Sequence, residues 1–149
     1  MSTQAGGPYL QAALFCERVL QENDGVLTIV RVIDRFTVQV RGPQASDALP
    51  PVPIGFTAVI ILKTGSFEGK YKLTLTPVTP TKKELPAASV DLLLEGGEDR
   101  GVNAILPVQM LANEEGVYWF EVKLAGQILT KIPLRLIYQT VSQSPPMAT

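Results

Sequence analysis

The chain has no histidine among its 149 residues. This absence excludes Ser-His and Cys-His nucleophile pairs, histidine-ligated zinc or non-haem iron, and any side chain that titrates near neutrality without a perturbed pKa. An enzyme built from the remaining residues would need a different proton-transfer group. We therefore expect a non-catalytic protein with no cofactor and no metal site.

Cysteine is almost as scarce, because Cys16 is the only one. A single cysteine excludes an internal disulfide. Cys16 alternates with Leu10, Ala12 and Leu14 in a period of two, so we expect a buried, small apolar side chain. The alternative is a reactive thiol, which would need exposure and a basic neighbour such as Arg18.

Neither sign of charge dominates, since 13 Lys and Arg against 14 Asp and Glu give a net charge of −1. The basic residues are scattered, so the composition gives no reason to expect binding to nucleic acid or to an anionic membrane. No Lys or Arg precedes Arg18, and Gln11, Glu17 and Arg18 interrupt the apolar stretch 9–20. Neither a signal peptide nor a transmembrane helix is predicted. We expect a cytoplasmic protein of bacterial type that binds no nucleic acid and no membrane.

Apolar residues, in contrast, are plentiful and make up 46% of the chain. A single domain of this length removes about 70% of the unfolded chain's surface from water, which is enough for a core without disulfides or metal. The expected organisation is a disordered N-terminus over residues 1–7, a single β-sandwich domain over residues 8–139, and a flexible C-terminal tail over residues 140–149.

Residues 116–138 show the clearest local pattern. Aromatic and aliphatic side chains occupy every second position over residues 118–124, and residues 128–137 alternate in the same way. Such alternation is typical of strands with one buried face. The two arms meet at Ala125-Gly126, where a primed hairpin turn fits because glycine accepts a positive φ.

The rest of the chain also predicts strands. Residues 9–20 fit a helix or a strand, and the strand is favoured because a turn signal and a β-branched run follow directly. The run 25–41 exceeds one ordinary strand, so we expect a break near Asp34-Arg35 that carries it from one sheet to the other. Further strands are predicted at 56–63, 70–78, 90–96 and 102–111, with turns at 65–69 and 98–101 and with Pro107 at an edge or bulge. The spacing predicts an all-β fold, namely a two-sheet antiparallel β-sandwich of about eight to nine strands, immunoglobulin-like or jelly-roll-like.

Four segments carry a resemblance: ALFCERV, GVLTIVRVIDRFTV, GKYKLTL and GVYWFEVKLAGQILTKIPLRL. In order and spacing they resemble an uncharacterised bacterial family of small cytosolic β-sandwich proteins, over residues 10–138. Ala125-Gly126 stands where Asp-Gly is common in that family, which changes turn chemistry. The resemblance implies the fold, and it brings no activity, cofactor or site residue to this chain.

An exposed apolar patch is the first candidate site. Trp119 faces away from Tyr118 and Phe120, so both faces of its strand carry aromatic side chains. Trp119 is then covered either by the second sheet or by a partner, and aromatic residues are enriched in interfaces. The candidate partner-binding residues are Trp119, Val117, Leu129 and Ile137.

Charged residues supply two further candidates. Arg31, Asp34 and Arg35 form a candidate polar rim, which could bind an anionic or polar ligand. The favoured interpretation is a set of ion pairs on a solvated face, together with Glu17 and Arg18. Acids near turns lack the alternating spacing of a calcium loop, so we expect them to be solvated. They are Asp91, Glu95, Glu98, Asp99, Glu114 and Glu115.

The predicted function is a protein-protein interaction module that binds a protein partner or associates with itself. Binding would use a sheet face built around Trp119 or an unpaired edge strand. Two alternatives remain open: a structural subunit of a homo-oligomer or phage-type particle, and a small-ligand-binding protein with a site at the loop end. Sandwiches serve all three roles, so the fold does not decide among them.

Overall fold

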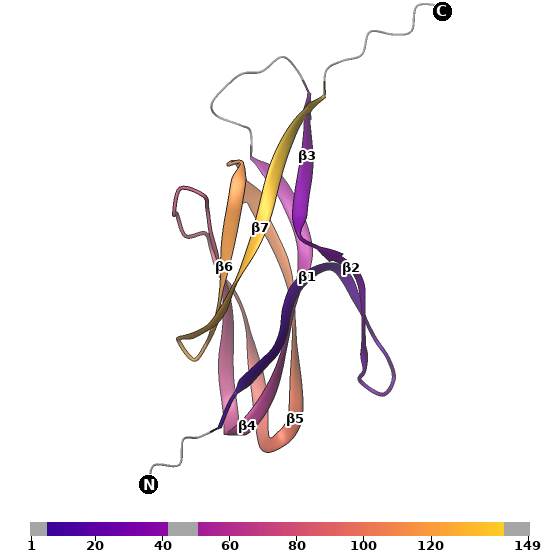
Figure 1. The fold of residues 1–149 in the computed structure, drawn as a ribbon, viewed down its shortest axis with the longest axis vertical. Helices are drawn as coiled ribbons and strands as arrows, with labels where there is room; N and C mark the ends of the chain where they lie inside the picture. Colours follow the sequence, from indigo (N-terminus) through magenta and orange to yellow (C-terminus); the bar gives the residue numbers. More distant parts are fainter. Residues whose placement is uncertain (1–5, 42–50, 142–149) are drawn as a thin grey trace, which may run out of the picture.

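A computed structural model describes residues 6–41 and 51–141, and every element labelled within these two ranges is a β-strand (Figure 1). The strands are β1 (Tyr9–Gln21), β2 (Leu27–Ile33), β3 (Arg35–Arg41), β4 (Val52–Val78), β5 (Ala88–Ala112), β6 (Gly116–Leu124) and β7 (Gln127–Val141). They are ordered β2-β1-β4-β6-β7-β3, and β5 pairs with β4. The predicted all-β sandwich is confirmed.

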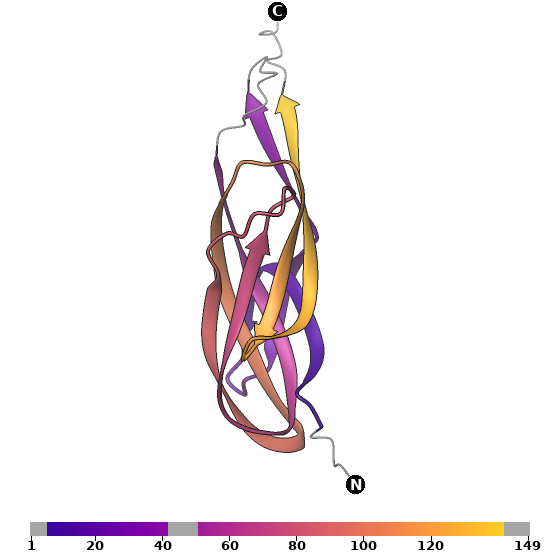
Figure 2. The same cartoon turned by 90° about the vertical axis from the view of Figure 1, so that its left-hand side faces the viewer.

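β4 and β5 are long because each passes from one layer of the sandwich to the other. β1 pairs with residues 57–63 of β4, whereas β6 pairs with residues 73–78. β5 stays paired with β4 along both arms. We call the first layer, formed by β2, β1, residues 52–63 of β4 and residues 101–112 of β5, layer I. Layer II consists of residues 88–95 of β5, residues 68–78 of β4, β6, β7 and β3. Figure 2 shows the two strands bending together at one end of the elongated molecule.

The bends replace two predicted turns, at 65–69 and 98–101. Gly65 lies opposite Gly97, and the pairing register shifts on both sides of Gly65. Gly65 has a φ of +61°, and a Cβ there would lie 2.2 Å from the carbonyl oxygen of Gly6, so only glycine permits this approach. The backbone N–H of Ser66 donates to the same oxygen at 2.9 Å. Counting the two arms of β4 and of β5 separately gives nine segments, in agreement with the predicted number.

The run 27–41 crosses between layers as predicted. β2 pairs with β1 in layer I, and β3 pairs with β7 in layer II, so the break near Asp34-Arg35 is confirmed. The expectation of wholly antiparallel sheets is wrong at this strand, because β3 is parallel to β7. Figure 1 shows the arrow of β3 pointing to the same end of the molecule as that of β7.

Phenylalanines from both layers meet in the core. Phe15 of β1 packs edge-on against Phe120 of β6, with ring centroids 4.8 Å apart. Phe56 of β4 lies 4.7 Å from Phe15 and 5.6 Å from Phe120. Edge-to-face pairs add to the free energy of burial, so this cluster fixes how the layers face each other.

The first segment is the predicted strand, β1, and it forms the predicted hairpin with β2. The backbone N–H of Gly25 donates to the carbonyl of Glu22 at 2.9 Å and closes the turn. At the other end β7 reaches Val141, two residues past the expected domain boundary. Residues 1–5 and 142–149, where disorder is predicted, lie outside the described residues.

Candidate interaction surfaces

Trp119 lies on the outer face of layer II. Its cross-strand neighbours are Val78 on β4 and Pro133 on β7. The side chain is 40% exposed, whereas Tyr118 and Phe120 on either side of it are buried in the core. The buried neighbours on the same strand therefore fix the position of Trp119, and its side chain remains accessible to solvent.

The structure brings two of the three other predicted patch residues to this face. Val117 and Ile137 are half-buried on it, but Leu129 is not part of it. A bulge in β7 leaves Leu129 without an opposite residue on β6, and its side chain packs against the core. Ile128, 52% exposed, takes the outward place instead. The apolar area around Trp119 is consequently smaller than the sequence predicts.

Charged side chains surround Trp119. The Glu121 carboxylate lies 3.6 Å from the Lys123 ammonium and 3.9 Å from that of Lys131. A hollow of about 410 Å³, which we call the Trp119 hollow, is lined by Val78, Lys82, Trp119, Glu121 and Lys131. The sequence alone does not predict this hollow, because Lys82 comes from the loop after β4 and no local pattern fixes where that loop lies.

The predicted polar rim does not converge on one site. The Arg31 guanidinium pairs with Glu17 of β1 at 3.0 Å, and Arg35 pairs with its neighbour Asp34 at 3.4 Å. All four side chains are more than half exposed, so these ion pairs add little to stability. This arrangement matches the favoured interpretation of ion pairs on a solvated face.

The outer face of layer I is apolar across four strands. One row runs from Val32 through Cys16 and Thr57 to Pro107, and the next contains Leu14, Val59 and Ile105. We call these residues, with Ala12 and Ile61, the apolar face. None of them is charged, whereas layer II presents many lysines and acids outward. The near-continuous apolar run 56–62 is the sequence signal for it, because a strand with one wet face alternates.

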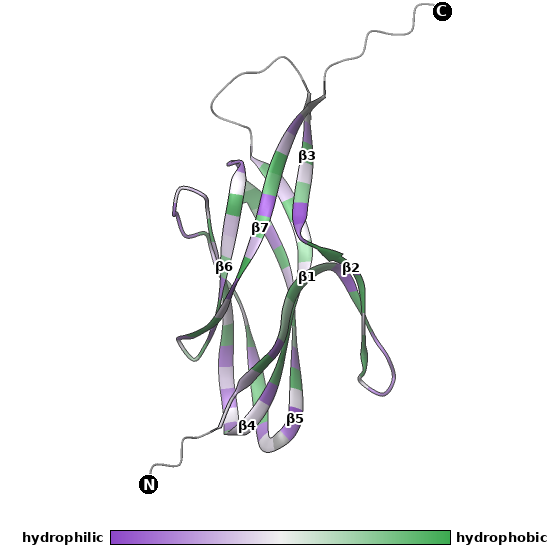
Figure 3. Ribbon diagram, viewed as in Figure 1, coloured by the Kyte–Doolittle hydropathy of each residue, from purple (hydrophilic) through white to green (hydrophobic). Residues whose placement is uncertain are grey.

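The hairpin of β1 and β2 extends this face. Residues 17–31 form a ribbon that stands clear of the sandwich, which we call the β1–β2 arm (Figure 1). Leu20 and Val26 on the arm and Val32 at its base are exposed, and Figure 3 shows hydrophobic colour along β1 and β2. A two-stranded ribbon is only marginally stable in water. Its exposed apolar side chains are also hydrated at a cost in free energy, which a binding partner would remove.

Two of the edge strands, β2 and β5, carry features that oppose pairing with another strand. β2 is an edge strand, but Arg31 in its middle has a φ of +58° and an exposed charge, which opposes pairing with another strand. β5 pairs with β4 alone among the described strands and carries Pro107 at the edge position predicted for it. The apolar face is therefore better suited to binding than either of these two edges.

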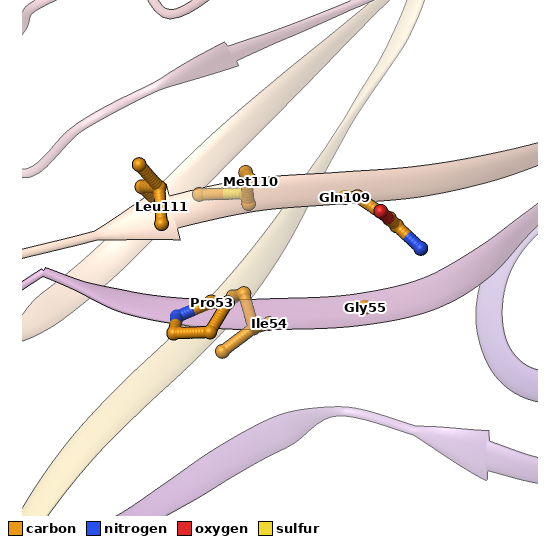
Figure 4. A pocket seen from close by; sticks show the side chains of 6 residues that line it. All are labelled: Pro53, Ile54, Gly55, Gln109, Met110 and Leu111. Atoms are coloured by element: carbon orange, nitrogen blue, oxygen red, sulfur yellow. The ribbon is translucent and has the colours of Figure 1, made fainter.

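A second hollow, of about 380 Å³, opens at the end of layer I (Figure 4). It lies beside Gly55, where the closest atoms to a Cβ would be 3.8 Å away on Val108 and Gln109. Pro53 and Leu111 flank it on the outer side. It has no ionisable lining residue, so it resembles the apolar face in chemistry.

Cys16 belongs to the apolar face and is fully buried beneath its neighbours. Burial raises the pKa of the thiol above 9.0, and a weak hydrogen bond from Sγ to the carbonyl of Arg18 at 3.5 Å opposes this only in part. The thiol is protonated at neutral pH, which is the state of an inert, structural cysteine.

The acids near turns do not assemble. Among residues 6–41 and 51–141, no three acidic or cysteine side chains are placed to hold a metal ion. Glu114 accepts from the backbone N–H of Thr81 at 3.1 Å, and Glu115 accepts from that of Tyr138 at 3.0 Å. These two carboxylates therefore fasten loops. The side chain of Glu98 lies outside the described part of the chain.

No helix in the described ranges is long and apolar enough to cross a membrane.

Comparison with known proteins places the chain in a family. The sequence profile of DUF6941, a family of unknown function, matches residues 11–137, and the chain belongs to that family. The search of curated proteins found no significant match. Among solved structures, an immunoglobulin-like protein from Pseudomonas aeruginosa is similar, with 12% sequence identity and a TM-score of 0.39 over 90% of this chain and 99% of that one.

Proposed function

We propose that the protein is a non-catalytic interaction module that binds another protein through the apolar face and the β1–β2 arm. The observation that carries the proposal is the contrast between the two outer faces. One has the charged, wet surface expected of a sandwich, and the other has rows of uncharged side chains across four strands.

The size of the face suits the core of an interface. β1 pairs with β4 over residues 9–16, with β5 alongside. Three strands of that length have a geometric footprint on the order of 400 Å² at the usual strand spacing and rise, although Cys16 and Val59 within it are themselves fully buried. A standard interface buries about 800 Å² on each partner, so the arm and the rim around Gly55 would supply the remainder.

The chemistry of the face defines the partner. With no charge in its central rows, it fits an apolar protein surface and offers no phosphate-binding group. The pKa of Cys16, Tyr118 and Tyr138 is raised, chiefly by burial, so each stays protonated at neutral pH and none is primed for catalysis. The proposal includes a bacterial cytoplasmic setting, with which an unpaired cysteine agrees.

Site-specific crosslinking in the source cell tests the proposal. A photoreactive p-benzoylphenylalanine replaces Val32, an exposed member of the apolar face, and in a matched control it replaces Ile128 on layer II. We expect one protein to crosslink at position 32 alone. Its binding to the purified chain, measured by calorimetry, should weaken at least tenfold in Val32→Glu and remain unchanged in Ile128→Glu.

Two results would overturn the proposal in different ways. Crosslinking to another copy of the chain, with a solution mass that rises with concentration, would favour the homo-oligomeric subunit. No crosslink to another protein at position 32, or equal crosslinking at both positions with a monomeric mass throughout, would show that the apolar face is not a specific protein-binding site.

A further inference from the structure

The Trp119 hollow has features that the proposed function does not use. It lies on the outer face of layer II, whereas the apolar face belongs to layer I. Its lining comes from β4, β6, β7 and the loop after β4, and its volume of about 410 Å³ falls within the range of small-molecule sites. The hollow therefore combines separate elements of the sequence into one surface feature.

One lining side chain of the hollow is an indole ring carried on a strand. Trp119 is flanked by Val78 and Pro133, and its strand is paired on both sides. A ring held on a rigid strand loses little conformational freedom when a ligand stacks on it. Its 40% exposure leaves part of the ring accessible for stacking.

The charges of the hollow are unbalanced. Lys82 and Lys131 both line it, against the single carboxylate of Glu121. That carboxylate is also shared with Lys123 at 3.6 Å, while its contact with Lys131 is longer, at 3.9 Å. The Lys131 ammonium is therefore only loosely engaged. An anionic group in the hollow would lie close to two lysine side chains and one carboxylate, so the net charge around it would be positive.

The loop that carries Lys82 is held in place by hydrogen bonds to its own backbone and side chains. The backbone N–H of Lys82 donates to the Thr79 carbonyl at 2.9 Å, and that of Lys83 donates to the Thr79 hydroxyl at 3.0 Å. The backbone N–H of Leu85 donates a hydrogen bond of 2.9 Å to the carbonyl of Pro77. Lys82 itself has a φ of +70°. Such preorganisation lowers the entropic cost of binding, because the loop does not have to be fixed by the ligand.

We propose that the Trp119 hollow binds a small ring-bearing carboxylate. The ring stacks on the Trp119 indole, the carboxylate lies between Lys82 and Lys131, and Glu121 accepts a hydrogen bond from a ring hydroxyl in those ligands that carry one. A sugar acid and an aromatic acid share this chemistry, so the ring type is decided by experiment. The site is independent of the protein-binding face.

Tryptophan fluorescence tests the site directly, because Trp119 is the only tryptophan. The full chain is titrated with glucuronate and with phenylacetate, and with glucose and phenylacetamide as neutral counterparts. We expect saturable change with at least one acid below about 10 mM, tenfold above the 1 mM dissociation constant of a weak site. The neutral counterpart should bind at least fivefold more weakly. Stronger binding of glucuronate assigns a sugar acid, and stronger binding of phenylacetate assigns an aromatic acid.

Variants separate the site from a general charge effect. Lys82→Gln and Lys131→Gln should each weaken binding of the acid about fivefold, since each removes one of two ammonium groups. Lys70→Gln, on the same face and outside the hollow, should leave it unchanged. No saturable change with either acid, equal affinity for acid and neutral ligand, or an equal effect of all three variants would overturn the proposal.

Discussion

The hydroxyl of Tyr118 donates a hydrogen bond of 2.9 Å to the carbonyl of Glu114, four residues earlier in the chain. The hydroxyl oxygen of Tyr118 also accepts a hydrogen bond of 3.2 Å from the backbone N–H of Glu114. One side chain therefore satisfies both backbone groups of a residue in the loop between β5 and β6. This is the geometry by which a tyrosine fastens a connection between the two layers of a sandwich.

Tyr118→Phe should lower the free energy of unfolding by about 1 to 2 kcal/mol, because it leaves two partly buried backbone groups without a partner. Urea denaturation measures the change. Tyr71→Phe is a matched control, since the Tyr71 hydroxyl donates to Glu68 at an exposed site. An equal loss in both variants would argue against a special role for Tyr118.

The same tyrosine makes the free energy of unfolding depend on pH in the alkaline range. Burial, with the nearby Glu114 charge, raises the pKa of Tyr118 above its ordinary value of 10.0. Above pH 10 the unfolded chain loses this proton while the folded chain keeps it, so unfolding releases a proton and stability falls as pH rises. The stabilising contribution of the protonated Tyr118 hydroxyl is fully present below about pH 10 and is lost as the pH rises through the folded-state pKa. Wild type should lose more stability than Tyr118→Phe between about pH 8 and pH 11, and parallel curves would contradict the assignment.

Phe120→Ala should cost about 3 to 5 kcal/mol, because a fully buried ring leaves a cavity between Phe15 and Phe56. Trp119→Ala, one position away and 40% exposed, should cost clearly less. Chemical denaturation of both variants compares them directly. A larger loss for Trp119 than for Phe120 would mean that the faces of β6 are assigned in reverse.

Ala125 occupies a position that suits asparagine better. It has a φ of +51°, followed by Gly126 at +86°, as in a primed hairpin turn. Left-handed geometry costs a residue with a Cβ about 1 to 2 kcal/mol, and asparagine tolerates it better than alanine. Ala125→Asn should raise the melting temperature by about 2 to 4 °C, and Gly126→Ala should lower it. A lower melting temperature for Ala125→Asn would show that the turn is not strained.

The Cys16 thiol should report on unfolding. It is fully buried and its pKa is raised, so a thiol reagent should react with it only after the structure opens. The labelling rate should rise with denaturant in step with the loss of structure. Rapid stoichiometric labelling of the native protein at neutral pH would show that the apolar face opens readily around β1.

Much of the fold could be predicted because it depends on local patterns. The β1–β2 hairpin follows from a turn signal, and the crossing at Asp34 follows from a run too long for one strand. The corners in β4 and β5 could not be predicted in this way. A glycine at position 65 predicts a change of direction, but whether pairing survives depends on Gly97, far along the chain.

The candidate sites show the same limit. Trp119 could be identified from alternation, whereas the shift of Leu129 into the core depends on a bulge that alternation between two apolar residues does not reveal. The Trp119 hollow depends on where a loop brings Lys82, and the apolar face depends on register across four strands. Each requires contacts between distant segments.

The joint bend of β4 and β5 has a consequence for how the protein folds. The two strands are joined by the short connection 79–87, and their pairing begins next to it, at Leu75 opposite Ala88. It continues through the corner to Val52 opposite Ala112. Once that one short loop has closed, pairing between β4 and β5 can propagate residue by residue and form the centre of both layers. Contacts distant in sequence then form without a second loop closure. Amide protons on both sides of the corner should accordingly exchange with solvent as one cooperative unit.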